Sequence, residues 1–203
     1  MPSLKAIRKR ISSVKSTQKI TKAMKMVAAA RLNRAQQRIT ELRPYAVKTA
    51  ELLAELTARL AGDKETGEAA PAGGDALENA SDIHPLLVAR PEGRILMVVL
   101  TSDRGLCGAF NSNINKRAER EWRARTANGQ SVKLMVIGRK GRDYLTRRGA
   151  DIEYVPGVWE KLTQETAKAL GQKVLEPFLR KEVDAIYLVY NEFKSAMTQK
   201  ATI

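Results

Sequence analysis

The chain has 203 residues, a formal net charge of +14 and a single cysteine, Cys107. One cysteine excludes a disulfide framework within this sequence, the absence of any run of 18 or more apolar residues excludes a membrane-spanning helix, and the N-terminus lacks the apolar region of a secretory signal. The positive charge predicts an anionic partner, of which nucleic acid, a lipid surface and acidic protein loops are the alternatives.

Residues 3–60 carry an apolar heptad pattern that predicts one long helix. Apolar side chains recur in alternating steps of three and four, from Leu4 and Ile7 to Leu56 and Leu60, which places them along one stripe of a helix. A helix of this length would extend roughly 85 Å at about 1.5 Å per residue. Because a small domain cannot bury so long a stripe, we expect a coiled-coil partner along it.

Local signals indicate how this helix begins, bends and ends. Ser3 follows Pro2 and is a favourable N-cap residue. Pro44 interrupts the pattern while the heptad register continues beyond it, which predicts a kink or a local break within one element. Gly62 follows the last apolar position and is typical of a helix C-terminus.

The first 43 residues are also strongly basic, with twelve Lys and Arg against one acid, Glu41. The apolar stripe continues through this basic part. This weakens the nucleic-acid interpretation, because basic helices that enter the major groove need no such seam there. Between Gln18 and Lys25 the stripe becomes more polar. We expect this part of the helix to contact a different partner from the rest of it.

After the helix the composition changes twice. Residues 61–93 hold seven acidic against two basic side chains and are rich in Gly and Ala, which predicts an acidic loop or linker. Residues 94–203 alternate apolar strand patterns with helix patterns. They predict a three-layer α/β domain with a mainly parallel sheet, so the fold class is α/β with a long N-terminal coiled-coil helix over residues 1–60. The expected strands are 94–100, 132–137, 151–155, 185–190 and 197–203, and the expected helices are 110–122, 140–147 and 160–180.

No motif in the chain assembles an active site. The loop after the first strand lacks both glycine patterns that bind nucleotide phosphates. Residues 138–141 (GRKG) are more typical of a tight strand-to-helix turn than of a phosphate site. His84 is the sole histidine, so neither a zinc site nor a triad is supported, and Cys107 has no evident base partner. The sequence predicts no catalytic residue, no cofactor and no metal.

Two long motifs resemble the signatures of one family. Residues 20–32 (ITKAMKMVAAARL) are similar to the N-terminal helix signature of the gamma subunits of F-type ATP synthases, and residues 101–111 (TSDRGLCGAFN) resemble that family's second hallmark. Shorter similar segments stand in the same order at 43–46, 138–141 and 191–193. The family continues further, through a C-terminal helix, so we expect the present sequence to be a truncated form or one part of the protein.

This resemblance implies a non-catalytic rotor subunit. In that family the two terminal helices form an antiparallel coiled coil inside the alpha/beta hexamer, and the α/β domain is a foot that sits with epsilon on the ring of c subunits. Proton flow turns the ring and stalk, and the asymmetric shaft imposes different conformations on the beta subunits, which hold the catalytic residues. The implied location is peripheral, at the cytoplasmic face of the bacterial inner membrane. A basic coiled-coil protein that binds nucleic acid is the alternative.

Two sets of residues are expected to contact partners. The first, here called the shaft set, is expected to face the hexamer, where long-range attraction to acidic loops transmits torque without deep interlocking. The second, the foot motif, is expected to be structural and to form an interface. Their alternatives are a solvated helix face and a strand-to-helix turn. The shaft set comprises Arg8, Lys9, Lys19, Lys22, Met24, Lys25 and Arg31, and the foot motif comprises Asp103, Arg104, Gly105, Leu106 and Cys107.

Overall fold

The computed structural model of the chain describes residues 3–62, 85–87, 90–160, 162–195 and 198–203. It divides into two compact units, residues 1–74 and residues 75–203, and each is described by itself. Most of the predicted linker, including His84, lies outside the described residues.

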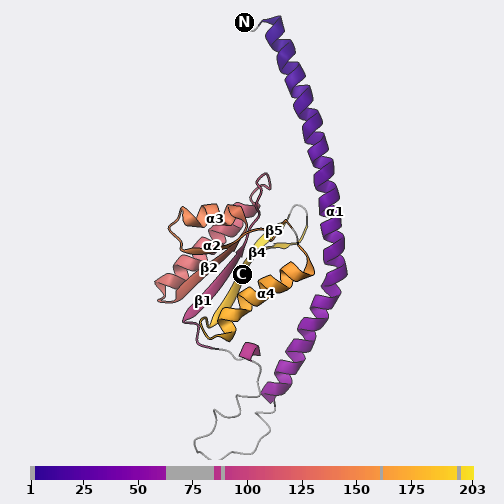
Figure 1. The fold of residues 1–203 in the computed structure, drawn as a ribbon. Helices are drawn as coiled ribbons and strands as arrows, with labels where there is room; N and C mark the ends of the chain where they lie inside the picture. The colour runs from indigo at the N-terminus through magenta and orange to yellow at the C-terminus, as the bar shows by residue number, and fades with distance from the viewer. Residues whose placement is uncertain (1–2, 63–84, 88–89, 161, 196–197) are drawn as a thin grey trace, which may run out of the picture. The chain divides into compact units, whose positions relative to one another are not determined.

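In the described part of the first unit, residues 3–62, one helix forms: α1, which spans Leu4–Gly62 (Figure 1). Ser3 precedes it, and the Ser3 Oγ accepts a hydrogen bond from the Ala6 amide at 3.4 Å, so the predicted N-cap is confirmed. Pro44 lies inside the helix, which continues through it without a break. The prediction of one element is therefore confirmed, and the local break that we considered does not occur within residues 3–62.

The apolar stripe of α1 is exposed from Leu4 to Leu56. Leu4, Val14 and Leu42 expose 70%, 67% and 65% of their surface, and no described side chain of α1 is buried. Since burial stabilises by roughly 25 cal/mol per Å² of apolar surface, α1 by itself gains less from this term than a helix packed in a core. The stripe is confirmed as a feature of a helix, and its coiled-coil partner stays a prediction.

The second unit, which we call the foot, is built on one five-stranded sheet in the order β3-β2-β1-β4-β5. The four strands from β1 to β4 run parallel, and β5 pairs antiparallel with β4. The central strands have near-continuous apolar sequences because both of their faces are buried. The strands are β1 Arg94–Leu100, β2 Ser131–Ile137, β3 Ile152–Val155, β4 Ala185–Phe193 and β5 Gln199–Thr202.

Helices cover both faces of this sheet, which makes the foot a three-layer domain as predicted. Helices α2 (Phe110–Ala127) and α3 (Arg139–Thr146) lie on one face, and α4 (Gln164–Leu179) lies on the other (Figure 1). A short 3-10 helix, η2, spans Pro85–Leu87. The expected α/β class with a mainly parallel sheet is confirmed.

The alternation of side chains along β1 divides the core in two. Met97 and Val99 are fully buried among side chains of α2 and α3, whereas Leu96 and Val98 pack on the opposite side with Phe178 of α4. This follows from the two-residue period of a strand.

Several element boundaries differ from the expected ones by one to five residues, the largest difference being the end of α2 at Ala127 rather than at 122. Two of the differences have a cause in hydrogen bonding. Helix α4 begins at Gln164 rather than near 160, because the Thr163 side chain caps it by accepting a hydrogen bond from the Thr166 amide. Strand β4 continues to Phe193, three residues beyond the apolar run, because β5 pairs with its polar end. Both differences arise from hydrogen bonds rather than from apolar periodicity.

An ion pair joins the starts of β1 and β4. The Asp184 carboxylate accepts hydrogen bonds from the Arg94 amide at 2.8 Å, from its Nε at 3.1 Å and from its Nη2 at 2.7 Å. The Arg94 side chain and amide together lower the pKa of Asp184 to about 2. This contact holds the two central strands in register at their amino ends.

Candidate functional site

The foot motif follows β1 at the carboxyl edge of the sheet. In doubly wound sheets this edge is the usual ligand site, at the point where successive connections go to opposite sides. Here β1 is flanked by β2 on one side and β4 on the other, so the loop of residues 101–109 lies at that point. Its backbone and side-chain groups therefore decide whether a ligand can be held there.

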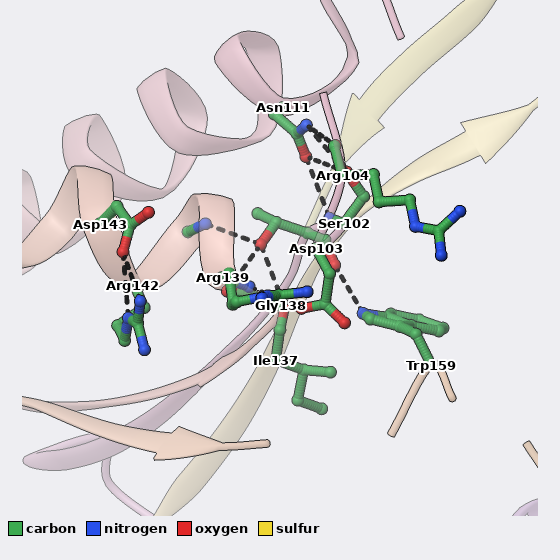
Figure 2. Close-up of polar contacts among 12 residues, drawn as sticks. Ser102, Asp103, Arg104, Asn111, Ile137, Gly138, Arg139, Arg142, Asp143 and Trp159 are labelled. Atoms are coloured by element: carbon green, nitrogen blue, oxygen red, sulfur yellow. Dashed lines mark hydrogen bonds and ion pairs between the residues drawn. The ribbon is translucent and has the colours of Figure 1, made fainter. Parts of the chain in front are cut away.

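Thr101 anchors the start of this loop and is 1% exposed. Its amide donates to the Ile137 carbonyl at 2.8 Å, and its Oγ1 donates to the same carbonyl at 3.1 Å. Its own carbonyl accepts a hydrogen bond from the Trp159 indole Nε1 at 2.7 Å (Figure 2). Three segments that are far apart in sequence thus meet at one buried threonine.

The loop also satisfies the first amides of α3. The Arg139 amide donates to Asp103 Oδ1 at 2.8 Å, and the Lys140 amide donates to the Ser102 carbonyl at 3.1 Å. The Gly141 amide donates to Thr101 Oγ1 at 2.9 Å. A helix N-terminus binds phosphate through such amides, and these three already have partners within the protein. The segment 138–141 is therefore a strand-to-helix turn, as the sequence favoured.

Gly138 is required by this close approach. Its φ is +103°, and a Cβ built on it would lie 2.2 Å from the Thr101 carbonyl oxygen. An L side chain neither favours that φ nor fits in that space. The glycine therefore allows the loop and the start of α3 to touch.

A second set of hydrogen bonds shapes the loop from the side of α2. The Ser102 amide donates to Asn111 Oδ1 at 3.0 Å, and the Ser102 hydroxyl donates to the Arg104 carbonyl at 2.6 Å. The Asn111 Nδ2 contacts Cys107 Sγ at 3.1 Å. Figure 2 shows Asn111 and Ser102 side by side above the start of α3. The loop is thus held from both ends.

The tip of the loop is exposed and strained. Leu106 exposes 95% of its surface and has a φ of +63°, a left-handed conformation that costs a non-glycine residue about 1–2 kcal/mol. The neighbouring Arg104, Gly105 and Cys107 are exposed as well. Strain of this kind is often retained where a loop has a function, and it holds an apolar side chain out in solvent.

The structure therefore divides the foot motif. Asp103 caps α3 and its side chain is 15% exposed, so its role within the chain is structural, while residues 104–107 form the exposed tip. Sequence reasoning did not assign a role to Thr101, Asn111 or Trp159. The first two lie inside the quoted hallmark, which was the available signal, but nothing in the sequence links Trp159 to a loop 58 positions earlier.

The shaft set is exposed on α1, but it does not form one face. At about 100° per residue, Arg8, Lys19, Lys22 and Lys25 project to one half of the helix circumference, and Lys9, Met24 and Arg31 project to the other half. No ion pair found among the described residues involves the six cations of this set. Surfaces of two kinds are thus available, a basic one and one that includes Met24, which is 52% exposed.

Two further kinds of site were sought among the described residues, a metal site and a membrane-spanning helix. Within the described ranges, no three or more His, Cys, Asp or Glu side chains are grouped so as to hold a metal ion. No helix in the part of the chain that the structure describes is long and apolar enough to cross a membrane.

Comparison with known proteins finds similarity over nearly the whole chain. The sequence model described as ATP synthase matches residues 3–203. The ATP synthase gamma chain of Sorangium cellulosum (strain So ce56) is 65% identical over 214 residues, which cover 100% of this chain and 65% of that protein. The gamma chain of Geobacter sp. (strain M21) is 43% identical over 203 residues, which cover 100% of this chain and 64% of that protein.

A solved structure supports the fold. The central stalk and c-ring structure of the Tetrahymena thermophila mitochondrial ATP synthase contains a chain that matches with a TM-score of 0.61 and 24% identity, over 90% of this chain and 70% of that one. At this identity the likeness concerns the fold alone. The present chain spans 64–65% of the length of the two curated relatives.

Proposed function

The chain belongs to the ATP synthase family, and we propose that it is the gamma-type central-stalk subunit, a non-catalytic rotor that couples proton flow to ATP synthesis in an alpha/beta hexamer. The observation that carries this proposal is α1, a 59-residue helix whose apolar stripe is exposed from Leu4 to Leu56 and whose cations up to Arg43 take part in no ion pair found among the described residues. A rotor shaft needs both features, because it pairs with another helix and turns inside a ring of subunits.

The charge of α1 suits a rotating contact. Attraction between separated charges falls off gradually and needs no interlocking geometry, so a cationic shaft can follow acidic loops through a turn. We propose that the shaft set meets the hexamer, and that Met24 supplies an apolar contact there. The comparisons give no support to the nucleic-acid alternative.

The foot supplies the second contact surface of the proposed rotor. Residues 104–107 are exposed on a loop whose shape is fixed by hydrogen bonds from α2 and α3. A preformed loop loses little entropy on binding. We propose that this tip contacts another subunit, that the foot sits with epsilon on the c ring, and that the subunit is peripheral at the cytoplasmic face of the bacterial inner membrane.

Co-purification tests the proposal directly. The chain, expressed with a tag in cells that make the ATP synthase, is expected to come out with alpha, beta and epsilon subunits. Free chain that binds DNA with a steep salt dependence, without those subunits, would support the nucleic-acid alternative instead.

A single substitution tests the shaft contact. Met24→Lys places a further charge on the exposed side of α1 and is expected to impair proton pumping per ATP hydrolysed in inverted vesicles. Ala29→Ser, a small change in the same part of the helix, is the control. Unchanged pumping by Met24→Lys in assembled complexes would contradict the assigned contact.

A further inference from the structure

The two helical layers of the foot differ in charge. Helix α2 and residues 139–148, which contain α3, carry ten Lys and Arg against three acids. Helix α4, on the other face of the sheet, carries two Lys against two Glu. Since both layers cover the same sheet (Figure 1), the positive charge of the foot is concentrated on its α2–α3 side.

The acids of this layer are turned inward and its cations outward. Glu119, Glu121 and Asp143 are half-buried, and each accepts a hydrogen bond from a side chain of the same layer. Eight of the ten cations are exposed, and five of these eight take part in no ion pair found among the described residues. The layer therefore presents unneutralised positive charge to the solvent.

The cations of α2 form a stripe on its outer side. Lys116, Arg120 and Arg123 follow one another in steps of four and three, which return to one side of a helix. Ile114 and Ala118 are fully buried and lie on the opposite side. The stripe therefore points directly away from the sheet.

Helix α3 continues this charged surface. Glu119 Oε1 lies 3.0 Å from Arg123 Nη2 of α2 and 3.2 Å from Arg148 Nη1 beyond the end of α3. At the other end of α3, the Asn115 Nδ2 donates to the Lys140 carbonyl at 3.3 Å. Cations of the two helices thus lie on one continuous surface.

Three further acids flank this layer. Asp103 caps α3 and lies 3.8 Å from Arg139, and Glu92 pairs with Arg125 at 3.1 Å. Asp151, between α3 and β3, is exposed, and no ion pair of it is found among the described residues. One exposed acid at the border leaves the surface strongly positive.

The same surface lacks apolar anchors. Among residues 110–127 and 139–148, no large apolar side chain is exposed. Interfaces between proteins centre on buried aromatic or aliphatic anchors and have few charges at their centre. Cations without such anchors fit a flat array of phosphate groups, which guanidinium and ammonium groups bind through charge and hydrogen bonds.

We propose that this surface, here called the basic face, binds the anionic headgroups of a phospholipid membrane. Each Lys or Arg close to such headgroups increases the affinity roughly fivefold. The partner is lipid rather than nucleic acid because the proposed function, on which this inference rests, places the chain beside a membrane. The basic face comprises Lys116, Arg120, Arg123, Lys140, Arg147 and Arg148.

Co-sedimentation of the full chain with vesicles tests this binding. The probe is vesicles of phosphatidylcholine and phosphatidylglycerol in a two-to-one ratio, with pure phosphatidylcholine vesicles as the reference. Lys116→Glu/Arg120→Glu is expected to weaken binding to the anionic vesicles by at least about twentyfold. Lys168→Glu/Lys194→Glu makes the same charge change at exposed positions outside the basic face, and it should weaken binding less than about threefold.

A second pair of substitutions tests the α3 part of the basic face. Lys140→Glu/Arg147→Glu is expected to weaken binding as much as the α2 pair does. Because α1 is basic as well, all pairs are compared in a chain that also carries Lys19→Gln, Lys22→Gln and Lys25→Gln. Each variant should keep the denaturant midpoint of the foot, measured by tryptophan fluorescence, since the substituted side chains are exposed.

The outcomes separate the basic face from net charge and from other partners. Lys116→Arg/Arg120→Lys keeps the charge and should bind as the unsubstituted face does. Equal losses in the glutamate pairs inside and outside the basic face would overturn the proposal, and so would equal binding to pure phosphatidylcholine. It would also be overturned by a DNA duplex that binds more tightly than the vesicles and needs the same cations. Vesicle binding requires no other subunit, so its failure and a failed co-purification are separate results.

Discussion

The helix α1 and the foot use apolar residues in opposite ways. In the foot, apolar side chains are buried on both faces of a sheet, and both tryptophans, Trp122 and Trp159, pack within it or against its loops. In α1, the apolar stripe is exposed from Leu4 to Leu56. The buried apolar side chains therefore stabilise the foot without a partner, whereas the exposed stripe of α1 is available to associate with one. Substitutions in the two regions should accordingly affect different measurements.

The largest difference is expected from a core truncation. Ile137→Ala removes a fully buried side chain and should lower the free energy of unfolding of the foot by about 2–5 kcal/mol. Leu42→Ala on α1, where the side chain is 65% exposed, should change it by less than about 0.5 kcal/mol. Denaturant unfolding followed by tryptophan fluorescence reports the foot alone and measures both. Equal effects of the two variants would contradict the contrast between the buried core of the foot and the exposed stripe of α1.

The second largest loss in the free energy of unfolding is expected from a backbone change at the loop–helix contact. Gly138→Ala combines an unfavourable φ with a Cβ 2.2 Å from a carbonyl oxygen, and we expect a loss of about 3 kcal/mol. Gly149→Ala shares a positive φ but has no atom within 4 Å of the added Cβ, so it should cost about 1–2 kcal/mol. The same fluorescence experiment applies. If both variants lose equally, steric contact with Thr101 is not what selects Gly138.

A smaller effect is expected from the cap of α3. Asp103→Ala removes the acceptor of the Arg139 amide and should lower the free energy of unfolding by about 1 kcal/mol. Asp103→Asn keeps an acceptor oxygen and should lose less. Arg104→Ala, one residue on and exposed, should leave stability within about 0.5 kcal/mol. A stability loss at Arg104 that matches that at Asp103 would contradict the division of the foot motif.

The smallest effect should be a dependence on acid. The pKa of Asp184 is about 2 in the folded chain, below its ordinary 3.8, because of Arg94. A lowered carboxylate pKa means that the ion pair contributes fully above the unfolded value and is lost as pH falls through the folded one. The foot should therefore lose thermal stability between about pH 4 and pH 2. Asp184→Asn should lose less on acidification, and an identical slope in both proteins would refute the assignment.

The long helix and the alternation of strands and helices were predictable from sequence. The apolar spacing along α1 and the apolar runs of β1 and β2 are local patterns. The spacing predicts a helix, and the continuous runs predict buried strands. The start of α4 at Gln164 and the polar end of β4 were not predictable in this way. They depend on a side-chain cap and on pairing with β5, neither of which leaves an apolar pattern.

The sequence by itself determined the fold class, the long basic helix and the family, because these reside in periodicity, composition and long motifs. Only the tertiary structure decided that Asp103 caps α3 while Leu106 is exposed to solvent. Neighbouring residues of one loop differ in this way because they contact different distant segments. It also decided that the Trp159 indole donates a hydrogen bond to the Thr101 carbonyl. Burial and hydrogen bonding between remote segments are properties of the assembled layers, and no local pattern encodes them.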